Sequence, residues 1–118
     1  MMESYGPPER IRRKSEFSEL YAKGRSHRGR YFTLVFLPSR SGRSRMAAVA
    51  SRKVGGAVQR NKARRRAKEL FRRNKALILN PLDLVVIARK SMVEAPWTSL
   101  RDDYLKALEA AGRETGGK

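Results

Sequence analysis

Residues 53–76 read KVGGAVQRNKARRRAKELFRRNKA, and this stretch decides the fold. Apolar residues recur in and just after it at helical spacing and form one stripe: Ala63, Ala67, Leu70, Phe71, Leu77 and Ile78. The stripe predicts an amphipathic helix from Ala57 to about Ala76, which Asn80 and Pro81 end. Two glycines precede it and predict a turn, because glycine allows positive φ and close approach of the backbone.

The remaining faces of this helix are strongly basic. Residues 57–76 hold 9 Lys or Arg and 1 acidic residue, Glu69. A solvent-exposed helix normally offsets such charge with acidic residues at i±4. A polyanionic partner therefore explains this helix better than solvation alone, the alternative. Five polar residues share one face beside the apolar stripe: Arg60, Asn61, Arg64, Arg65 and Lys68. Arginine suits bidentate contacts with phosphate.

The turn before the helix is a second place where an anion could bind. Gly55 and Gly56 leave the first backbone N–H groups of the helix open, and the helix dipole favours an anion there. Arg52 and Lys53 flank the same place. An ordinary glycine turn at a strand–helix junction explains the two glycines equally well.

Charge is unevenly distributed over the 118 residues, whose net charge is +17. Residues 1–56 carry 13 basic and 4 acidic side chains, whereas residues 77–118 carry 6 of each. The excess therefore lies wholly in the first two thirds of the chain. Solubility needs no such asymmetry, but a surface that meets a dense polyanion does.

Shorter elements flank the central helix. Residues 31–37 and 46–51 predict an antiparallel hairpin, and the apolar run at 83–88 predicts a buried strand. Residues 16–23 predict a short helix with Ser15 as its N-cap, and Ser99 with Asp102 predicts a capping box at the start of a last helix.

These elements predict one α+β domain at 15–111, with the order α-β-β-α-β-α. We expect two layers, with the helices on one face of a small sheet. Residues 1–14 are expected to form a flexible basic arm, because Pro7 and Pro8 block regular structure. Residues 112–118 are expected to form a frayed tail.

Several classes of protein are excluded or disfavoured. The chain has no cysteine, which rules out disulfide and thiolate chemistry and fits a reducing cytoplasm. Its apolar runs are too short to span a bilayer, and neither basic segment pairs with a broad apolar face that would bind a membrane surface. His27 is the only histidine and lies among arginines, and no cluster of residues has metal-ligand spacing. We therefore expect no catalytic residue and no metal ligand in the protein.

Phe17 and Tyr21 lie one helical turn apart in the first predicted helix. Core packing is the simpler explanation for such a pair. A stacking surface for unpaired bases is the functional alternative. Both can hold if the pair lines a shallow groove between the first helix and the sheet.

The ordered run from Lys53 to Glu69 resembles the signature of the bacterial ribonuclease P protein family, which is close to K-V-G-N-A-V-x-R-N-R-x-K-R-x-x-R-E. Residues 16–24, 30–32 and 83–89 resemble other parts of that family, so the resemblance covers roughly residues 10–110. Departures are modest. Gly56 stands where the family usually has Asn, three basic residues exchange Lys and Arg, and Val35 occupies a strand position where some members carry an aromatic.

The resemblance implies an α-β sandwich with a small, mainly antiparallel sheet and a left-handed βαβ crossover, of the kind also found in a domain of a ribosomal protein. It implies that the central helix binds the catalytic RNA of ribonuclease P. We expect the residues in contact with this RNA to be Arg52, Lys53, Arg60, Asn61, Lys62, Arg64, Arg65 and Lys68.

The resemblance also implies that Phe17 and Tyr21 line a cleft for the single-stranded 5′ leader of precursor tRNA. In that family the RNA subunit cuts the phosphodiester with bound Mg²⁺, and the protein assists. We therefore expect a 1:1 ribonucleoprotein in the cytoplasm. A ribosomal-type structural RNA-binding protein is the main alternative, and a non-specific DNA-compacting protein is another. The ordered run at 53–69 favours the ribonuclease P protein.

Overall fold

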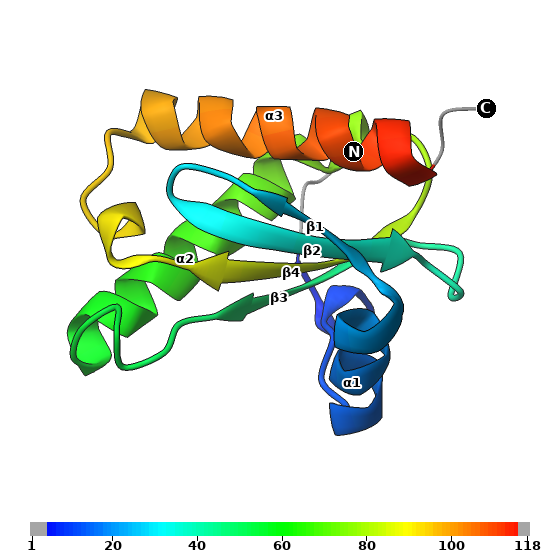
Figure 1. The fold of residues 1–118 in the computed structure, drawn as a ribbon, viewed down its shortest axis with the longest axis horizontal. Helices are drawn as coiled ribbons and strands as arrows, with labels where there is room; N and C mark the ends of the chain where they lie inside the picture. Colours follow the sequence, from blue (N-terminus) through cyan, green and yellow to red (C-terminus); the bar gives the residue numbers. More distant parts are fainter. Residues whose placement is uncertain (1–4, 116–118) are drawn as a thin grey trace.

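The computed structural model describes residues 5–115 of the chain as one α+β domain (Figure 1). Its main elements follow one another in this order: α1 (Lys14–Lys23), β1 (Arg25–Arg28), β2 (Phe32–Pro38), β3 (Arg45–Val49), α2 (Ala57–Asn74), β4 (Leu82–Ala88) and α3 (Trp97–Thr115). Three short 3-10 turns, η1 (Pro7–Glu9), η2 (Lys75–Leu77) and η3 (Lys90–Met92), join them. Within these described residues, no helix is both long enough and apolar enough to cross a membrane.

The strands form one sheet in the order β1-β2-β4-β3. β1 pairs with β2, and β2 with β4, in antiparallel fashion, whereas β3 runs parallel to β4. α2 connects those two parallel strands and passes behind the sheet in the view of Figure 1, so the βαβ crossover is left-handed. The predicted α+β class, the mainly antiparallel sheet and this crossover are confirmed.

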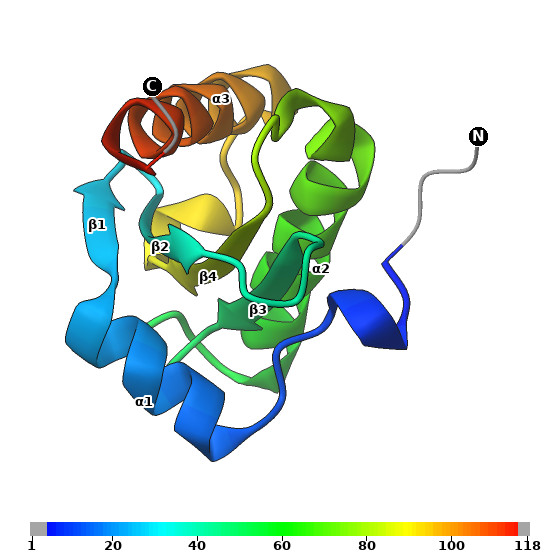
Figure 2. The same cartoon turned by 90° about the vertical axis from the view of Figure 1, so that its right-hand side faces the viewer.

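Helices cover both faces of the sheet. α2 and α3 pack on one face against alternate strand residues such as Phe32, Leu34 and Leu84. α1 packs on the other face, where Leu20 meets Val35 and further apolar residues of β3 and β4. Figure 2 shows α1 and α2 on opposite sides of the strands. The expectation that all helices share one face was therefore wrong for α1.

Several elements differ from the sequence predictions. The expected antiparallel hairpin of residues 31–37 and 46–51 was wrong, because β4 lies between β2 and β3 and β3 runs parallel to it. β1 was not predicted, although it is fully paired with β2. α3 begins at Trp97 and not near Ser99, since the N–H of Leu100 already donates to the carbonyl of Pro96 at 2.9 Å. The described first turn of α3 therefore lacks the predicted Ser99–Asp102 capping box. α3 also continues to Thr115, beyond the predicted start of a frayed tail at 112; residues 116–118 lie outside the described residues.

The described part of the predicted N-terminal arm packs against the domain. The Tyr5 hydroxyl donates to the carbonyl of Met46 at 2.6 Å, and its ring meets Phe71 edge to face at 5.6 Å. Arg10 forms a β-bridge with Met46, beside the edge strand β3. α1 begins at Lys14, with Arg13 and not Ser15 as its N-cap. Residues 5–14 thus contact the domain, whereas the sequence suggested a flexible arm over 1–14; residues 1–4 lie outside the described residues.

Candidate nucleic-acid interface

The turn before α2 brings basic residues to the start of the helix. Gly55 has φ of +144°, and a Cβ there would lie 2.9 Å from the Cβ of Gln59, so this position requires glycine. Gly56 is the N-cap, and no side chain caps the first turn of α2. Arg52 and Lys53 are exposed in the same turn. The open N–H groups and these two cations form a positively charged end of the helix.

One flank of α2 carries four of the predicted RNA-binding residues. Arg64 bridges Asn61 and the loop after β3, donating to the Asn61 Oδ1 at 3.0 Å and to the Ala50 carbonyl at 3.4 Å. Lys68 is exposed on this flank. The Nε of Arg60 is buried and has no hydrogen-bond partner among the described residues. Among the described residues, the side chains of Arg60 and Lys68 have no hydrogen-bond partner, whereas Arg64 uses both terminal nitrogens on Asn61 and Ala50.

The two other predicted residues of α2 lie elsewhere. Arg65 is exposed on the outermost face of the helix. Lys62 lies on the opposite flank, where its Nζ is 3.3 Å from a carboxylate oxygen of Glu94. The structure thus brings Arg60, Asn61, Arg64 and Lys68 together, with Arg65 beside them, and sets Lys62 apart.

The aromatic pair of α1 lies over the opposite face of the sheet. Phe17 is half-buried against the apolar cluster under α1, whereas Tyr21 is 51% exposed. Their rings stack at a centroid distance of 6.4 Å and an angle of 28°. Burial raises the pKa of the Tyr21 hydroxyl above its ordinary value of 10.0. Phe17 therefore packs against the core, whereas the Tyr21 ring is exposed to solvent.

An ion-pair network that the sequence did not reveal holds α1 in place. Arg45 of β3 donates two hydrogen bonds to Asp83 of β4, at 3.0 and 2.8 Å, and one to Glu16 of α1 at 2.7 Å. The two carboxylates raise the pKa of Arg45, and the hydrogen bond from Arg45 lowers that of Glu16. The pattern of apolar residues could not reveal this network, because its members are 29 and 38 residues apart.

The other titratable residues considered as candidates are His27 and Asp103. His27 lies in β1 opposite Leu34. Asp103 accepts hydrogen bonds from the backbone N–H groups of Arg30 and Tyr31 at 3.0 and 2.9 Å, which fixes the turn between β1 and β2. Residues 5–115 contain no group of three or more His, Asp or Glu that could hold a metal ion.

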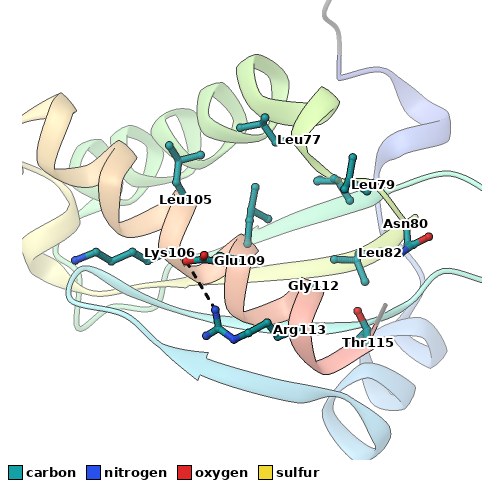
Figure 3. Close-up of a pocket in the computed structure, with 12 residues that line it drawn as sticks. Leu77, Leu79, Asn80, Leu82, Leu105, Lys106, Glu109, Gly112, Arg113 and Thr115 are labelled. Atoms are coloured by element: carbon teal, nitrogen blue, oxygen red, sulfur yellow. Dashed lines mark ion pairs between the residues drawn. The ribbon is translucent and has the colours of Figure 1, made fainter. Parts of the chain in front are cut away.

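An apolar groove of about 620 Å³ lies away from the basic flank, between the segment after α2 and the C-terminal half of α3. Leu77, Leu79 and Leu105 line it, and an Arg113–Glu109 ion pair of 3.8 Å lies at its rim (Figure 3). Leu77 and Leu79 are 56% and 88% exposed. The groove differs chemically from the cationic surface of α2, and none of the predicted site residues lines it.

Comparisons with known proteins agree on one family. The family model described as Ribonuclease P matches residues 6–112. The chain is 39% identical to the ribonuclease P protein component of Thermotoga maritima over 94 residues, 80% of each chain. It is 32% identical to that of Desulforapulum autotrophicum over 117 residues, covering 98% of this chain and all of the relative.

Solved structures are similar as well. The RNase P protein of Thermotoga maritima matches with a TM-score of 0.77 at 34% identity, covering 86% of this chain and 96% of the other. The RNase P protein of Staphylococcus aureus matches with a TM-score of 0.77 at 28% identity, covering 87% and 94%. Sequence and structural similarity both extend over nearly the whole described domain.

Proposed function

This chain belongs to the ribonuclease P protein family, and from that premise we propose that it binds the catalytic RNA of ribonuclease P and the 5′ leader of precursor tRNA. As a protein component of that endoribonuclease it takes part in tRNA processing. We propose a 1:1 complex with the RNA, acting in the cytoplasm, in which the leader is removed to give the mature 5′ end of the tRNA.

The basic flank of α2 is the single observation that carries RNA binding. Arg60, Arg64 and Lys68 lie on that flank beside Asn61, and Arg65 adjoins them. A guanidinium group donates two parallel hydrogen bonds to a phosphate, which makes arginine the residue of choice for such contacts. Arg52 and Lys53 extend the positive charge to the start of the helix. Lys62 faces Glu94 and adds to the positive electrostatic potential around the helix.

We assign the leader to the surface beside α1. Tyr21 offers an exposed aromatic face on which an unpaired base can stack, and Phe17 supports it from below. Val35 of β2 lies buried under α1 at the strand position where some members of the family carry an aromatic. Base stacking at this surface therefore depends on Tyr21 in particular.

We assign the cleavage step to the RNA subunit with bound Mg²⁺. The protein contributes cations that hold RNA phosphates and an aromatic surface that holds the leader. Both are binding roles, which supports a protein that assists cleavage by the RNA. In this division of roles the protein raises the affinity for substrate and stabilises the active conformation of the RNA.

Reconstitution tests the proposal. The purified protein is added to a bacterial ribonuclease P RNA at low Mg²⁺, where the RNA alone is nearly inactive, and leader release from a precursor tRNA is followed. Strong stimulation is expected. Binding of the RNA without stimulation would favour a structural, ribosomal-type RNA-binding protein. Equal affinity for duplex DNA and no preference for the leader would favour a DNA-compacting protein.

A further inference from the structure

The second flank of α2 borders a hollow of about 600 Å³, and of the residues that line it only Arg65 belongs to the predicted RNA-binding set. Six residues of α2 and the start of α3 line this Trp97 hollow: Arg65, Arg66, Glu69, Arg72, Arg73 and Trp97. It is separate from the flank of Arg64, because Lys62 and Arg66 on its side of the helix contact the segment 92–95, whereas Arg64 contacts Ala50.

One wall of the Trp97 hollow is rigid. Arg66 donates hydrogen bonds to the carbonyls of Met92 and Val93 at 2.9 Å each, and to that of Ala95 at 2.6 Å. Its guanidinium carbon lies 5.9 Å from the centre of the half-buried Trp97 ring. These three bonds to backbone fix both the cation and the turn that leads into α3, so the wall is preorganised for a ligand.

Glu69 positions the cations of the other wall. Its carboxylate accepts two hydrogen bonds from Arg72, at 3.1 and 2.8 Å, and one from the Nε of Arg73 at 2.9 Å. The hydrogen bonds from Arg72 and Arg73 lower the pKa of Glu69, so the carboxylate stays charged. Arg73 binds Glu69 through its Nε alone, and its guanidinium carbon lies 5.6 Å from the centre of the Trp97 ring. Among the described residues, its two terminal nitrogens have no hydrogen-bond partner.

Four guanidinium groups and one carboxylate surround the hollow, so its net charge is +3. Arg65 adds an exposed guanidinium with no partner among the described residues. Such a set of donors in a concave surface matches a phosphate group, which accepts bidentate hydrogen bonds from arginine. The indole of Trp97 supplies an apolar aromatic surface directly beside those donors, as a nucleotide requires.

We propose that the Trp97 hollow is a second RNA site, which holds a backbone phosphate between Arg65 and Arg73 with the attached nucleotide against Trp97. The inference rests on the proposed function, since it takes the ribonuclease P RNA as the ligand. α2 then contacts RNA on both flanks and lies between two segments of it. An acidic peptide would satisfy the charge, but its carboxylates would leave the indole without a stacking partner.

The chain offers a direct reporter, because Trp97 is its only tryptophan. A bacterial ribonuclease P RNA is titrated into the full-length protein while Trp97 emission is recorded. We expect emission to change saturably along with binding. Arg73→Ala should weaken RNA binding by about tenfold, the loss of one charge-assisted contact. It should also lower the slope of log affinity against log salt by about one.

Arg113→Ala is the matched control, because it removes the same side chain from α3 beside the apolar groove. Arg73 is 55% exposed, so its removal should leave the far-ultraviolet circular dichroism unchanged. If the wild type binds the RNA but Trp97 emission is constant, or Arg73→Ala loses no more affinity than Arg113→Ala, the second site is overturned and the proposed function stands. A response of Trp97 to polyglutamate but not to RNA overturns it as well. Failure of the wild type to bind this RNA would overturn both the second RNA site and the proposed function.

Discussion

At the scale of single residues, Arg45 holds together the ion-pair network between the sheet and α1. It joins three elements through Asp83 and Glu16, and its side chain is only 17% exposed. Replacing it by Ala leaves the Asp83 carboxylate, itself 11% exposed, without its bidentate partner. We expect Arg45→Ala to lower the free energy of unfolding by about 3 kcal/mol, measured by urea denaturation. A loss equal to that of the exposed Arg43→Ala would contradict a structural role.

The same network makes stability depend on pH. The pKa of Glu16 is lower in the folded protein than its ordinary value of 4.5. A carboxyl whose pKa falls on folding stabilises the protein above its unfolded pKa, and this contribution is lost as pH falls through the folded pKa. We expect the midpoint of urea unfolding to drop between about pH 5 and pH 3. Glu16→Gln should reduce this drop but not abolish it, because Glu69 also has a lowered pKa.

Tyr21 separates substrate binding from folding more cleanly than Phe17 does. Phe17→Ala opens a space in the cluster under α1, so it should destabilise the protein as well as weaken leader binding. Tyr21 is half exposed, and Tyr21→Ala should leave the unfolding midpoint nearly unchanged. We expect it to weaken holoenzyme binding of precursor tRNA by about tenfold, the energy of one stacked base, and to spare mature tRNA. Tyr21→Phe, which keeps the ring, should bind as the wild type does; equal losses for both tRNAs would point to packing.

At the scale of elements, adjacent arginines of α2 have opposite roles. The side chain of Arg65 is exposed and makes no hydrogen bond or ion pair among the described residues, whereas Arg66 donates to three backbone carbonyls. Arg65→Ala should lower the salt slope of RNA binding by about one and leave stability unchanged. Arg66→Ala should lower the free energy of unfolding by about 2 kcal/mol, because it leaves buried carbonyls unpaired. Thermal melts and salt titrations of both variants test this; the reverse pattern would refute the assignment of the two flanks.

Elements with a strong apolar pattern were predictable from the sequence, and the others were not. α2 and β4 were predicted within two residues, since the period of their apolar residues is clear. β1 reads Arg-Ser-His-Arg and has no apolar period, so only its pairing with β2 makes it a strand. The side of the sheet that α1 covers was also hidden, because β2 and β4 are apolar on both faces.

The candidate site was likewise predictable from the sequence only in part. Arg60, Asn61, Arg64 and Lys68 share a face because helical geometry is regular, and a helical wheel found it. Lys62 was grouped with them, but the structure turns it toward Glu94. Arg66 of α2 contacts Trp97 of α3, which follows 31 residues later in the sequence. No local sequence pattern predicts such a contact.

At the scale of the whole molecule, the N-terminal segment joins the edge of the sheet to α2. Tyr5 links the edge strand β3 to α2 through Met46 and Phe71, and Glu9 forms an ion pair with Lys75 at the end of α2. We expect Tyr5→Ala to cost about 3 kcal/mol of stability, and Tyr5→Phe about 1 kcal/mol, the value of the hydrogen bond alone. Chemical denaturation of the two variants tests this. Equal stability of Tyr5→Ala and the wild type would mean that the segment is dispensable for folding.

The position of β4 has a consequence for synthesis of the chain. β4 lies between β2 and β3 and is the last strand to be translated, so only the β1–β2 hairpin can pair before it appears. Residues 1–76 carry 22 basic and 5 acidic side chains, the entire net charge of +17. Until Leu82–Ala88 leaves the ribosome, the nascent chain is thus a polycation with an open sheet. We expect a chain truncated before this strand to be a protease substrate and not a smaller folded domain, because it lacks the strand that pairs with both β2 and β3.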